Sequence, residues 1–588
     1  MGLSGLALIV FFLAHLFPIK VALIAAVIMS FLIPLFFKKK FGFELPRPKV
    51  NKIFFINSLF WGIIFSLILW QTTLKPTGDF FNASPSTYGD LPFHLNLITN
   101  FAYGNNFPPV NPLSPPIKLN YHFLADFISA IILVLSGNLR FSLIVPGVVM
   151  GTLTASAISL FVFRIGKSQL AALIAPFLFF MNGGIGFVKF FTNLADSKDW
   201  LFVPFRYAHI PEWGVEYPNI LAEIMMAERT LFIGFPLAVF VLFFLYIWTQ
   251  KNEKSAVILS GLGLGLLLYA NVYGFLTLGL LMMVMLLRNL LRRNPNRALD
   301  LFYSLSIAFI IAFPLVLGIV TKIGSSINGF IRFSPGEWPP LPGGKQKLVF
   351  WITNFGLVPI LSFIAIFKKG LISTKVRQVL GPLFLMVFLA HIVIFQPYSW
   401  DNNRFILYPY LAMSIFSSFV FVRIIQNANK GLRIFGLAFL GMSILSGFLV
   451  VYYDPQISSH LYSREDFELA EFVNKETDRS YNFLTSQSHN HPVASLAGRK
   501  VVLGYEGYLW THGVEDLEKK YQDIKTIYSY EDQSPWLLHL YNVGYVVFGP
   551  SEKEEFPSLQ EEEFIKRYSL IYNSDNYKIF DTRDLRIR

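Results

Sequence analysis

The sequence predicts a mostly α-helical, polytopic membrane protein of about thirteen spans, followed by a C-terminal soluble α/β domain. Hydrophobic residues make up 54% of the 588-residue chain and charged residues only 15%, whereas a typical soluble domain carries about 25% charged residues. Apolar stretches of roughly 17–25 residues recur along the first three quarters of the chain, the length needed to cross a bilayer. Each stretch is expected to be a helix, because a helix satisfies its own backbone hydrogen bonds in lipid.

The net charge of +12 combines two unlike parts of the chain. Residues 453–588 contain 15 Lys and Arg against 23 Asp and Glu, so residues 1–452 carry all of the basic excess. That excess falls in short loops between apolar stretches, as expected of cytoplasmic loops, so it does not indicate a nucleic-acid partner. The absence of cysteine from the sequence excludes disulfides, thiol catalysis and cysteine metal sites.

Basic loops orient the predicted membrane module, residues 1–452. With the Arg288–Arg297 and Arg423–Arg433 clusters on the cytoplasmic side, the long loop 183–229 and the soluble domain 453–588 fall outside the cytoplasm. Counting forward from the basic Lys38–Lys40, the long loop 71–119 also falls outside. We therefore expect a multi-pass protein of the cell membrane. Counting crossings from the two ends disagrees by one between Asn120 and Met181, so one of the three apolar stretches there is not expected to cross fully.

The C-terminal domain mixes strand and helix patterns, which is typical of α/β structure. Runs rich in β-branched and aromatic residues predict strands at Tyr481–Thr485, Lys500–Tyr505, Tyr545–Gly549 and Tyr577–Thr582. Helical patterns lie at Ser463–Asn474, Val514–Asp523 and Glu561–Tyr568. No set of residues in this domain forms a recognisable catalytic pattern.

The loop 71–119 and its return to the bilayer carry a concentration of polar residues. Asp79 and Asp90 follow an apolar stretch, and the pattern becomes helical from Asp90 onwards. Residues four apart share one face of a helix, so Asp90 and His94 can point into the same small volume. The Tyr121–His122 pair stands where the chain re-enters the bilayer.

These residue types suit the transfer of a group from a phosphate carrier to a hydroxyl. A carboxylate can serve as the general base, so Asp90 and His94 are the candidate catalytic residues. A leaving phosphate requires cationic or hydrogen-bonding partners, and Arg229 and Arg404 each stand at the outer end of a predicted helix. The candidate substrate-binding residues are Asp79, Tyr121, His122, Arg229, Asp401 and Arg404.

Each candidate also has a purely structural alternative. Asp90 follows a glycine and could act only as a helix N-cap, and the arginines could be snorkelling residues at the membrane interface. Asp79, Asp90 and Asp401 together would suit Mg²⁺ or Mn²⁺, but no ligand spacing supports a metal site. No other cofactor is expected.

In these motifs the chain resembles the GT-C superfamily of membrane glycosyltransferases, particularly its protein-mannosyltransferase and aminoarabinose-transferase-like branches. The matching elements are Asp90, the turn Gly104–Pro109, the helix entry Leu119–His122 and the late segment Asp401–Phe405. The chain is also similar to uncharacterised multi-pass proteins of bacteria and archaea that have been placed near this superfamily. It departs from the usual Asp-Glu or Asp-Asp pair, because Leu91 follows Asp90.

The resemblance implies an inverting transfer of a sugar from a polyprenyl-phosphate donor to an unidentified acceptor on the outer face, with Asp90 as general base. Two other readings remain open. A transporter or flippase would use broken helices, for which the Asn271–Gly274 break is the best candidate. A non-catalytic membrane scaffold would act through its C-terminal domain.

Overall fold

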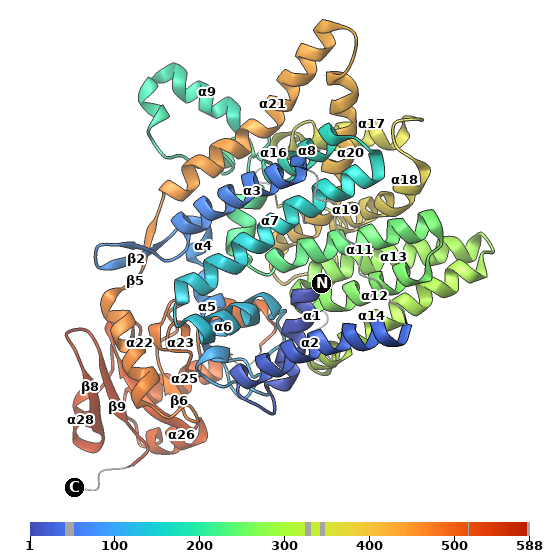
Figure 1. Ribbon diagram of the computed structural model, residues 1–588. Coiled ribbons are helices and arrows are strands. Elements are labelled where there is room, and N and C mark those ends of the chain that lie inside the picture. Colours follow the sequence, from blue (N-terminus) through green and yellow to red (C-terminus); the bar gives the residue numbers. More distant parts are fainter. Residues whose placement is uncertain (42–51, 324–330, 341–346, 515–516, 585–588) are drawn as a thin grey trace.

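The computed structural model describes residues 1–41, 52–323, 331–340, 347–514 and 517–584. Its long helices form one bundle, and the C-terminal segment with its sheet lies at one end of that bundle (Figure 1). The bundle helices are α1 (Gly2–Leu13), α2 (Ile19–Phe41), α3 (Lys52–Thr72), α6 (Leu124–Ser136), α7 (Leu139–Gly166), α8 (Gln169–Phe180), α11 (Leu231–Lys251), α12 (Lys254–Ala270), α13 (Val272–Leu291), α14 (Pro295–Ile323), α16 (Lys347–Phe355), α17 (Val358–Phe367), α18 (Thr374–Leu380), α19 (Phe384–Ala390), α20 (Leu407–Ile425) and α21 (Lys430–Tyr453).

The expectation of a polytopic helix bundle is confirmed. By length and composition, 7 described helices could cross a membrane, or 8 if the bent pair α16 and α17 forms one span. The shorter apolar helices α1, α6, α8 and α12 pack against other helices of the same bundle. The apolar window that contains α20 is 100% buried and that of α11 is 72% buried, against 28% for α3 and α21. Helices α11 and α20 therefore form the centre, and α3 and α21 lie at the periphery.

Two short helices are the candidates for the incomplete crossing that the sequence predicts. Helix α6 has 13 residues and α8 has 12, so each is shorter than the roughly 17 residues that a full crossing requires. The intervening α7 has 28 residues and an internal proline, Pro146. The structure therefore leaves the incomplete crossing between Asn120 and Met181 to α6 or α8 rather than to α7.

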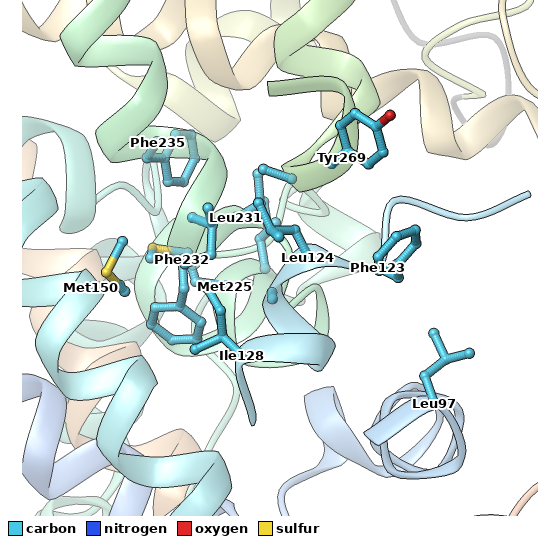
Figure 2. Packing of buried hydrophobic residues seen from close by; sticks show 14 of the residues in the cluster. Leu97, Phe123, Leu124, Ile128, Met150, Met225, Leu231, Phe232, Phe235 and Tyr269 are labelled. Carbon is cyan, nitrogen blue, oxygen red and sulfur yellow. The ribbon is translucent and has the colours of Figure 1, made fainter. Parts of the chain in front are cut away.

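The core of the bundle extends beneath the polar end of the molecule. Leu124 and Ile128 of α6 face Met225, Leu231 and Phe232, which precede or begin α11 (Figure 2). All five are nearly fully buried. Their packing fixes where α6 and α11 meet, which determines where the polar residues between positions 225 and 231 can lie.

The second long loop, residues 183–229, returns the chain into this core. It contains α9 (Gly186–Asp196), the short turns η1 (Lys198–Leu201) and η2 (Pro211–Trp213), the π-helical turn η3 (Ile220–Ile224) and α10 (Met225–Ala227). The small β3 (Arg332–Phe333) and β4 (Val393–Ile394) pair elsewhere, before the 3₁₀ turn η6 (Ser399–Ile406) that leads into α20.

The first long loop is joined to the C-terminal segment by a shared sheet. The loop contains β1 (Lys75–Thr77), β2 (Phe80–Ala83), α4 (Pro85–Tyr88) and α5 (Leu91–Ala102). Strand β2 pairs antiparallel with β5 (Ser459–Ser463), which follows α21, in a three-stranded sheet of order β1-β2-β5 (Figure 1). The segment that the sequence predicts as a separate soluble domain is thus hydrogen-bonded to the membrane module.

The C-terminal segment has the predicted mixture of helices and strands. Its second sheet has the order β6-β7-β9-β8, with β6 and β7 parallel and the other pairs antiparallel. The strands are β6 (Asn482–Leu484), β7 (Val543–Phe548), β8 (Ser569–Asn573) and β9 (Lys578–Asp581). The helices are α22 (Arg464–Glu476), α23 (Pro492–Ser495), α24 (Glu506–Thr511), α25 (Leu517–Tyr528), α26 (Ser534–Leu540), α27 (Pro550–Glu555) and α28 (Glu561–Arg567).

One predicted strand is wrong. Lys500–Tyr505 forms only an isolated bridge to Phe483, because its backbone N–H groups are used elsewhere. The N–H of Val501 donates to the carbonyl oxygen of Pro112, and the N–H of Gly504 donates to that of Leu113. Strand β8 was not predicted, and residues 515–516 of the predicted helix Val514–Asp523 lie outside the described residues.

Candidate functional site

Asp90 stands immediately before the first residue of α5. Its backbone is already in the helical region and its side chain makes no capping hydrogen bond. In the described part of the chain its carboxylate has no hydrogen-bond or ion-pair partner. Asp90 therefore does not act as a side-chain N-cap, and both carboxylate oxygens are available to a ligand.

Helix α5 is fixed against the C-terminal segment by side chains on one face. The Nδ2 of Asn96 donates to the carbonyl oxygen of Ala494 at 3.0 Å, and the Nδ2 of Asn100 donates to that of Gly498 at 2.9 Å. The two asparagines are four residues apart and thus share a face. These bonds hold α5, and with it Asp90, in a set position relative to the C-terminal segment.

A cavity of about 520 Å³, called here the Asp90 cavity, opens beside the start of α5. Its walls come from α5, from the segment before α6, from the start of α13, from η6 and the residues before it, and from α24 of the C-terminal segment. The lining residues are Gly89, Asp90, Phe93, His94, Tyr121, His122, Glu228, Tyr273, Gln396, Tyr398, Asp401, Arg404, Tyr505, Gly507, Tyr508, Trp510, Thr511 and His512.

The structure brings most of the predicted site residues together in this cavity. Six of the eight line it, namely Asp90, His94, Tyr121, His122, Asp401 and Arg404. They come from three regions of the sequence that the bundle brings to one end. The two that do not line it are Asp79 and Arg229.

Arg404 is the central cation of the cavity. Its Nε donates to Oε2 of Glu228 at 2.7 Å and its Nη1 donates to Oδ1 of Asn403 at 2.6 Å. Oδ1 of Asp401 lies 3.9 Å from its Nη2. A guanidinium carries five N–H donors, so these contacts leave donors for a ligand. The Arg404 side chain is 19% exposed, so part of it can be reached from the cavity.

Asp90 shares the cavity with this cation. Its carboxylate interacts electrostatically with both Arg404 and Asp401, although it forms no direct bond with either. Glu228 and Asp401 are already paired with the guanidinium, and Asp90 is not. Among the described residues, the cavity thus holds a carboxylate without a direct partner and a cation with free donors. This arrangement suits binding an anionic leaving group beside a base.

A buried pair supports His94 from below. Its Nδ1 lies 3.0 Å from Oδ1 and 2.9 Å from Oδ2 of Asp126, and the two side chains are 2% and 0% exposed. Nε2 of His94 makes no hydrogen bond to a described residue, and the ring lines the cavity. A carboxylate on Nδ1 holds the proton there and leaves Nε2 able to accept one. Sequence reasoning missed Asp126, because it lies 32 positions away within an apolar helix.

The other two predicted residues have structural contacts. Arg229 is buried, and its Nη2 donates to the Leu143 carbonyl oxygen at 3.0 Å and to Oγ of Ser129 at 3.3 Å. It does not line the Asp90 cavity, and Asp126 is its electrostatic partner. Asp79 is exposed in the turn between β1 and β2, where its carbonyl oxygen accepts a backbone bond from Arg464.

The C-terminal segment closes one side of the cavity through α24. The hydroxyl of Tyr508 donates to the carbonyl oxygen of Gly89, the residue before Asp90. Tyr505 and Trp510 expose about half of their side chains at the same wall. Burial, followed by repulsion from His94, lowers the pKa of His512 to about 4. The sequence of α24 gave no signal that this helix forms a wall of the cavity, because none of its residues belongs to a known catalytic pattern.

The donor set for a metal ion is incomplete in the part of the chain that the structure describes. It contains no group of three or more His, Asp or Glu side chains placed to hold an ion. Asp79 lies outside the cavity, and Asp401 is near Arg404. The Asp79, Asp90 and Asp401 set that the sequence suggested for Mg²⁺ or Mn²⁺ is therefore not assembled.

No family model and no curated protein matches the sequence. Solved structures with a similar shape include the archaeal oligosaccharyltransferase AglB from Archaeoglobus fulgidus, in complex with an inhibitory peptide and a dolichol-phosphate. It is 12% identical with a TM-score of 0.49, over 90% of this chain and 74% of that chain. ArnT from Cupriavidus metallidurans, bound to undecaprenyl phosphate, is 10% identical with a TM-score of 0.48, over 90% and 97%.

Both of these proteins are GT-C glycosyltransferases, the superfamily that the sequence motifs resemble. Their TM-scores lie below 0.5, so the similarity in shape decides neither the fold nor the function of this chain. The functional argument rests on the residues of the Asp90 cavity.

Proposed function

We propose that this protein is a membrane glycosyltransferase that moves a sugar from a polyprenyl-phosphate donor to an acceptor hydroxyl. The observation that carries the proposal is the unpaired Asp90 carboxylate in the same cavity as the Arg404 guanidinium. The cavity lies at the polar end of an apolar helix bundle, where the phosphate of a membrane-bound carrier would stand. The choice of donor class follows from the resemblance of the sequence motifs.

The residues fit a single inverting displacement. The acceptor oxygen attacks the anomeric carbon of the donor sugar, and its proton passes to the Asp90 carboxylate. The bond between the anomeric carbon and the phosphate oxygen breaks, and that oxygen retains the electron pair. Arg404 stabilises the negative charge that develops on the polyprenyl phosphate, through the N–H donors that its protein partners leave free.

Orientation in the membrane forms part of the proposal. Asp90 belongs to the loop 71–119, and α24 belongs to the C-terminal segment 453–588. The positions of the basic loops predict that both lie outside the cytoplasm. The shared sheet of β2 with β5 requires the two to lie on the same face. The reaction is therefore assigned to the outer face, with an acceptor that reaches the cavity from that side.

A transporter is less well supported, because the polar side chain at the break between α12 and α13 already has hydrogen-bond partners within the protein. Asn271, between α12 and α13, donates to Glu228 at 2.9 Å and accepts from the hydroxyl of Tyr408 at 2.8 Å and the N–H of Gly274 at 3.0 Å. These bonds stabilise the break without any substrate. A transported solute would instead need the exposed polar groups of such a break.

The test is a transfer assay with purified protein and a panel of polyprenyl-phosphate sugars. Turnover by the wild type that is lost in Asp90→Asn and retained in Asp79→Asn would support the proposal, since both variants remove one loop carboxylate. Equal turnover by Asp90→Asn and wild type would reject Asp90 as the base. Binding of all donors without turnover, unchanged by Arg404→Gln, would favour a non-catalytic scaffold.

A further inference from the structure

A second polar cavity, of about 160 Å³, lies at the other end of α13 from the Asp90 cavity. Tyr273 on the first turn of α13 lines the Asp90 cavity, and Arg288 on its last turn lines the second one. A helix of 20 residues is about 30 Å long, the thickness of the hydrocarbon core. The two cavities therefore belong to opposite faces of the membrane.

Three arginines line this second cavity, here called the arginine cavity. The side chains of Arg288 and Arg292 have no hydrogen-bond or ion-pair partner among the described residues, and they repel each other electrostatically. The guanidinium of Arg297 lies 5.4 Å from the centre of the Trp248 ring. No carboxylate of a described residue lines the cavity. Like charges held together without a counter-charge indicate that an anion completes the site.

The carboxylate of Asp300, close to this cavity, is already engaged. Asp300 is buried on α14, and its Oδ2 accepts the indole N–H of Trp248 at 3.0 Å. It makes no ion pair with a described residue. Asp300 therefore orients the ring beneath Arg297 and does not neutralise Arg288 or Arg292.

The remaining lining groups favour an anion with oxygen acceptors. Amide side chains of Asn289, Asn294 and Gln378 share the wall with the arginines. The 29-residue helix α14 begins at Pro295 beside the cavity, so its positive dipole end faces the same region. Arginine forks and helix N-termini are the groups that bind phosphate in proteins. The volume equals that of about five water molecules, which suits one phosphate group with bound water.

The surface beside the arginine cavity indicates where the rest of the ligand would lie. Leu287, Leu290 and Leu291 on the last turns of α13 are 52%, 54% and 86% exposed. Apolar side chains next to a phosphate site at the end of membrane-spanning helices match the junction between the head group and acyl chains of a lipid. We propose that the arginine cavity binds the phosphate of an anionic lipid, whose acyl chains lie against these leucines.

The bias of basic residues towards cytoplasmic loops explains why arginines occur here, but it does not explain their convergence on one cavity. The loop that contains Arg423 and Arg433 is also basic, and neither of these exposed residues lines the arginine cavity. This pair provides a matched control, because removing it deletes two positive charges from the same predicted face of the membrane.

The experiment measures lipid binding to the full-length protein in nanodiscs and by native mass spectrometry. Wild type is expected to retain phosphatidylglycerol in preference to phosphatidylcholine by at least about 10-fold. Arg288→Gln/Arg292→Gln is expected to lose that preference, and Arg423→Gln/Arg433→Gln to keep it within about 2-fold. Because Arg292 is exposed, Arg292→Gln alone leaves the packing intact and tests the site if the double variant does not fold.

Inorganic phosphate and glycerol phosphate form a second arm of the experiment. If they compete with phosphatidylglycerol only at concentrations far above that of the lipid, the lipid assignment stands. If they bind as tightly as the lipid, the site takes a soluble phosphate and the lipid assignment is wrong. The phosphate site itself would be overturned if both double variants lost the preference for phosphatidylglycerol to the same extent, or if the wild type showed no such preference.

Discussion

Nε of Arg404 donates to Oε2 of Glu228 at 2.7 Å, although 176 positions separate the two residues. The bond joins η6 to the residues before α11, and Asn271 donates to the other carboxylate oxygen of Glu228 at 2.9 Å. Three parts of the bundle are therefore connected beneath the Asp90 cavity. Because the pair is mostly buried, it both stabilises the fold and sets where the guanidinium stands.

Removing the Glu228 carboxylate should destabilise the protein. Glu228→Gln leaves the Arg404 cation with the longer contact to the Asp401 carboxylate, at 3.9 Å, and breaking a buried pair from one side typically costs about 3–5 kcal/mol. The measurement is unfolding in detergent by heat or denaturant. The double variant Glu228→Gln/Arg404→Gln should regain part of the loss. A double variant as unstable as the sum of the two singles would show that the pair contributes no coupling energy.

Asp90→Asn should abolish transfer without affecting stability. A general base contributes about 10²–10⁴-fold to rate, whereas a carboxylate without partners contributes little to folding. The assay compares single-turnover rates and unfolding midpoints with those of Asp79→Asn, whose side chain is exposed in a hairpin turn. A large fall in the unfolding midpoint of Asp90→Asn would indicate a structural role instead.

Asp126→Asn should impair His94 without touching the cavity. The carboxylate that holds the proton on Nδ1 of His94 is replaced by an amide, so the ring loses its orientation and preferred tautomer, and the rate should fall by roughly 10²-fold. The measurement is the single-turnover rate of transfer at a fixed pH. Arg229→Gln is the matched control, because Arg229 also depends on Asp126 but lies outside the cavity. If both variants lose only stability, Asp126 has no part in the reaction.

His512 should make stability depend on pH. Its folded-state pKa of about 4 lies below the unfolded value of about 6.5, so the unfolded chain binds a proton that the folded chain does not. Stability is then fully present above pH 6.5 and falls as the pH drops towards 4, by at most about 3 kcal/mol. His512→Gln should reduce the dependence of the unfolding midpoint on pH between pH 6.5 and pH 4. An unchanged slope would show that His512 is not the group responsible.

Local patterns were sufficient to predict several features of this site. The four-residue spacing of Asp90 and His94 predicted that both lie on one face of a helix. In the structure both side chains line the Asp90 cavity at the start of α5. The polar segment that contains Asp401 and Arg404 stood out between apolar stretches, and it also lines that cavity. These predictions depend on helix periodicity and on composition, which adjacent residues determine.

The partners of those residues could not be predicted, because they are set by packing between distant parts of the chain. Tyr508 contacts Gly89 across 419 positions, and Asp126 lies in an apolar helix with no motif around it. Arg229 was misplaced for a related reason. Its depth in the bundle followed from the sequence, but its direction depended on how α11 packs against α6 and α7.

The sequence by itself determined that the chain crosses a membrane many times and that its polar residues collect at the ends of the helices, because the bilayer imposes a length and polarity on every span. Only the tertiary structure decided that Asp90 has no direct partner among the described residues, that Glu228 neutralises part of Arg404, and that α24 forms a wall of the cavity. Hydrophobicity acts on each segment separately, whereas a site is made by contacts between segments, whose geometry is fixed only when the bundle packs.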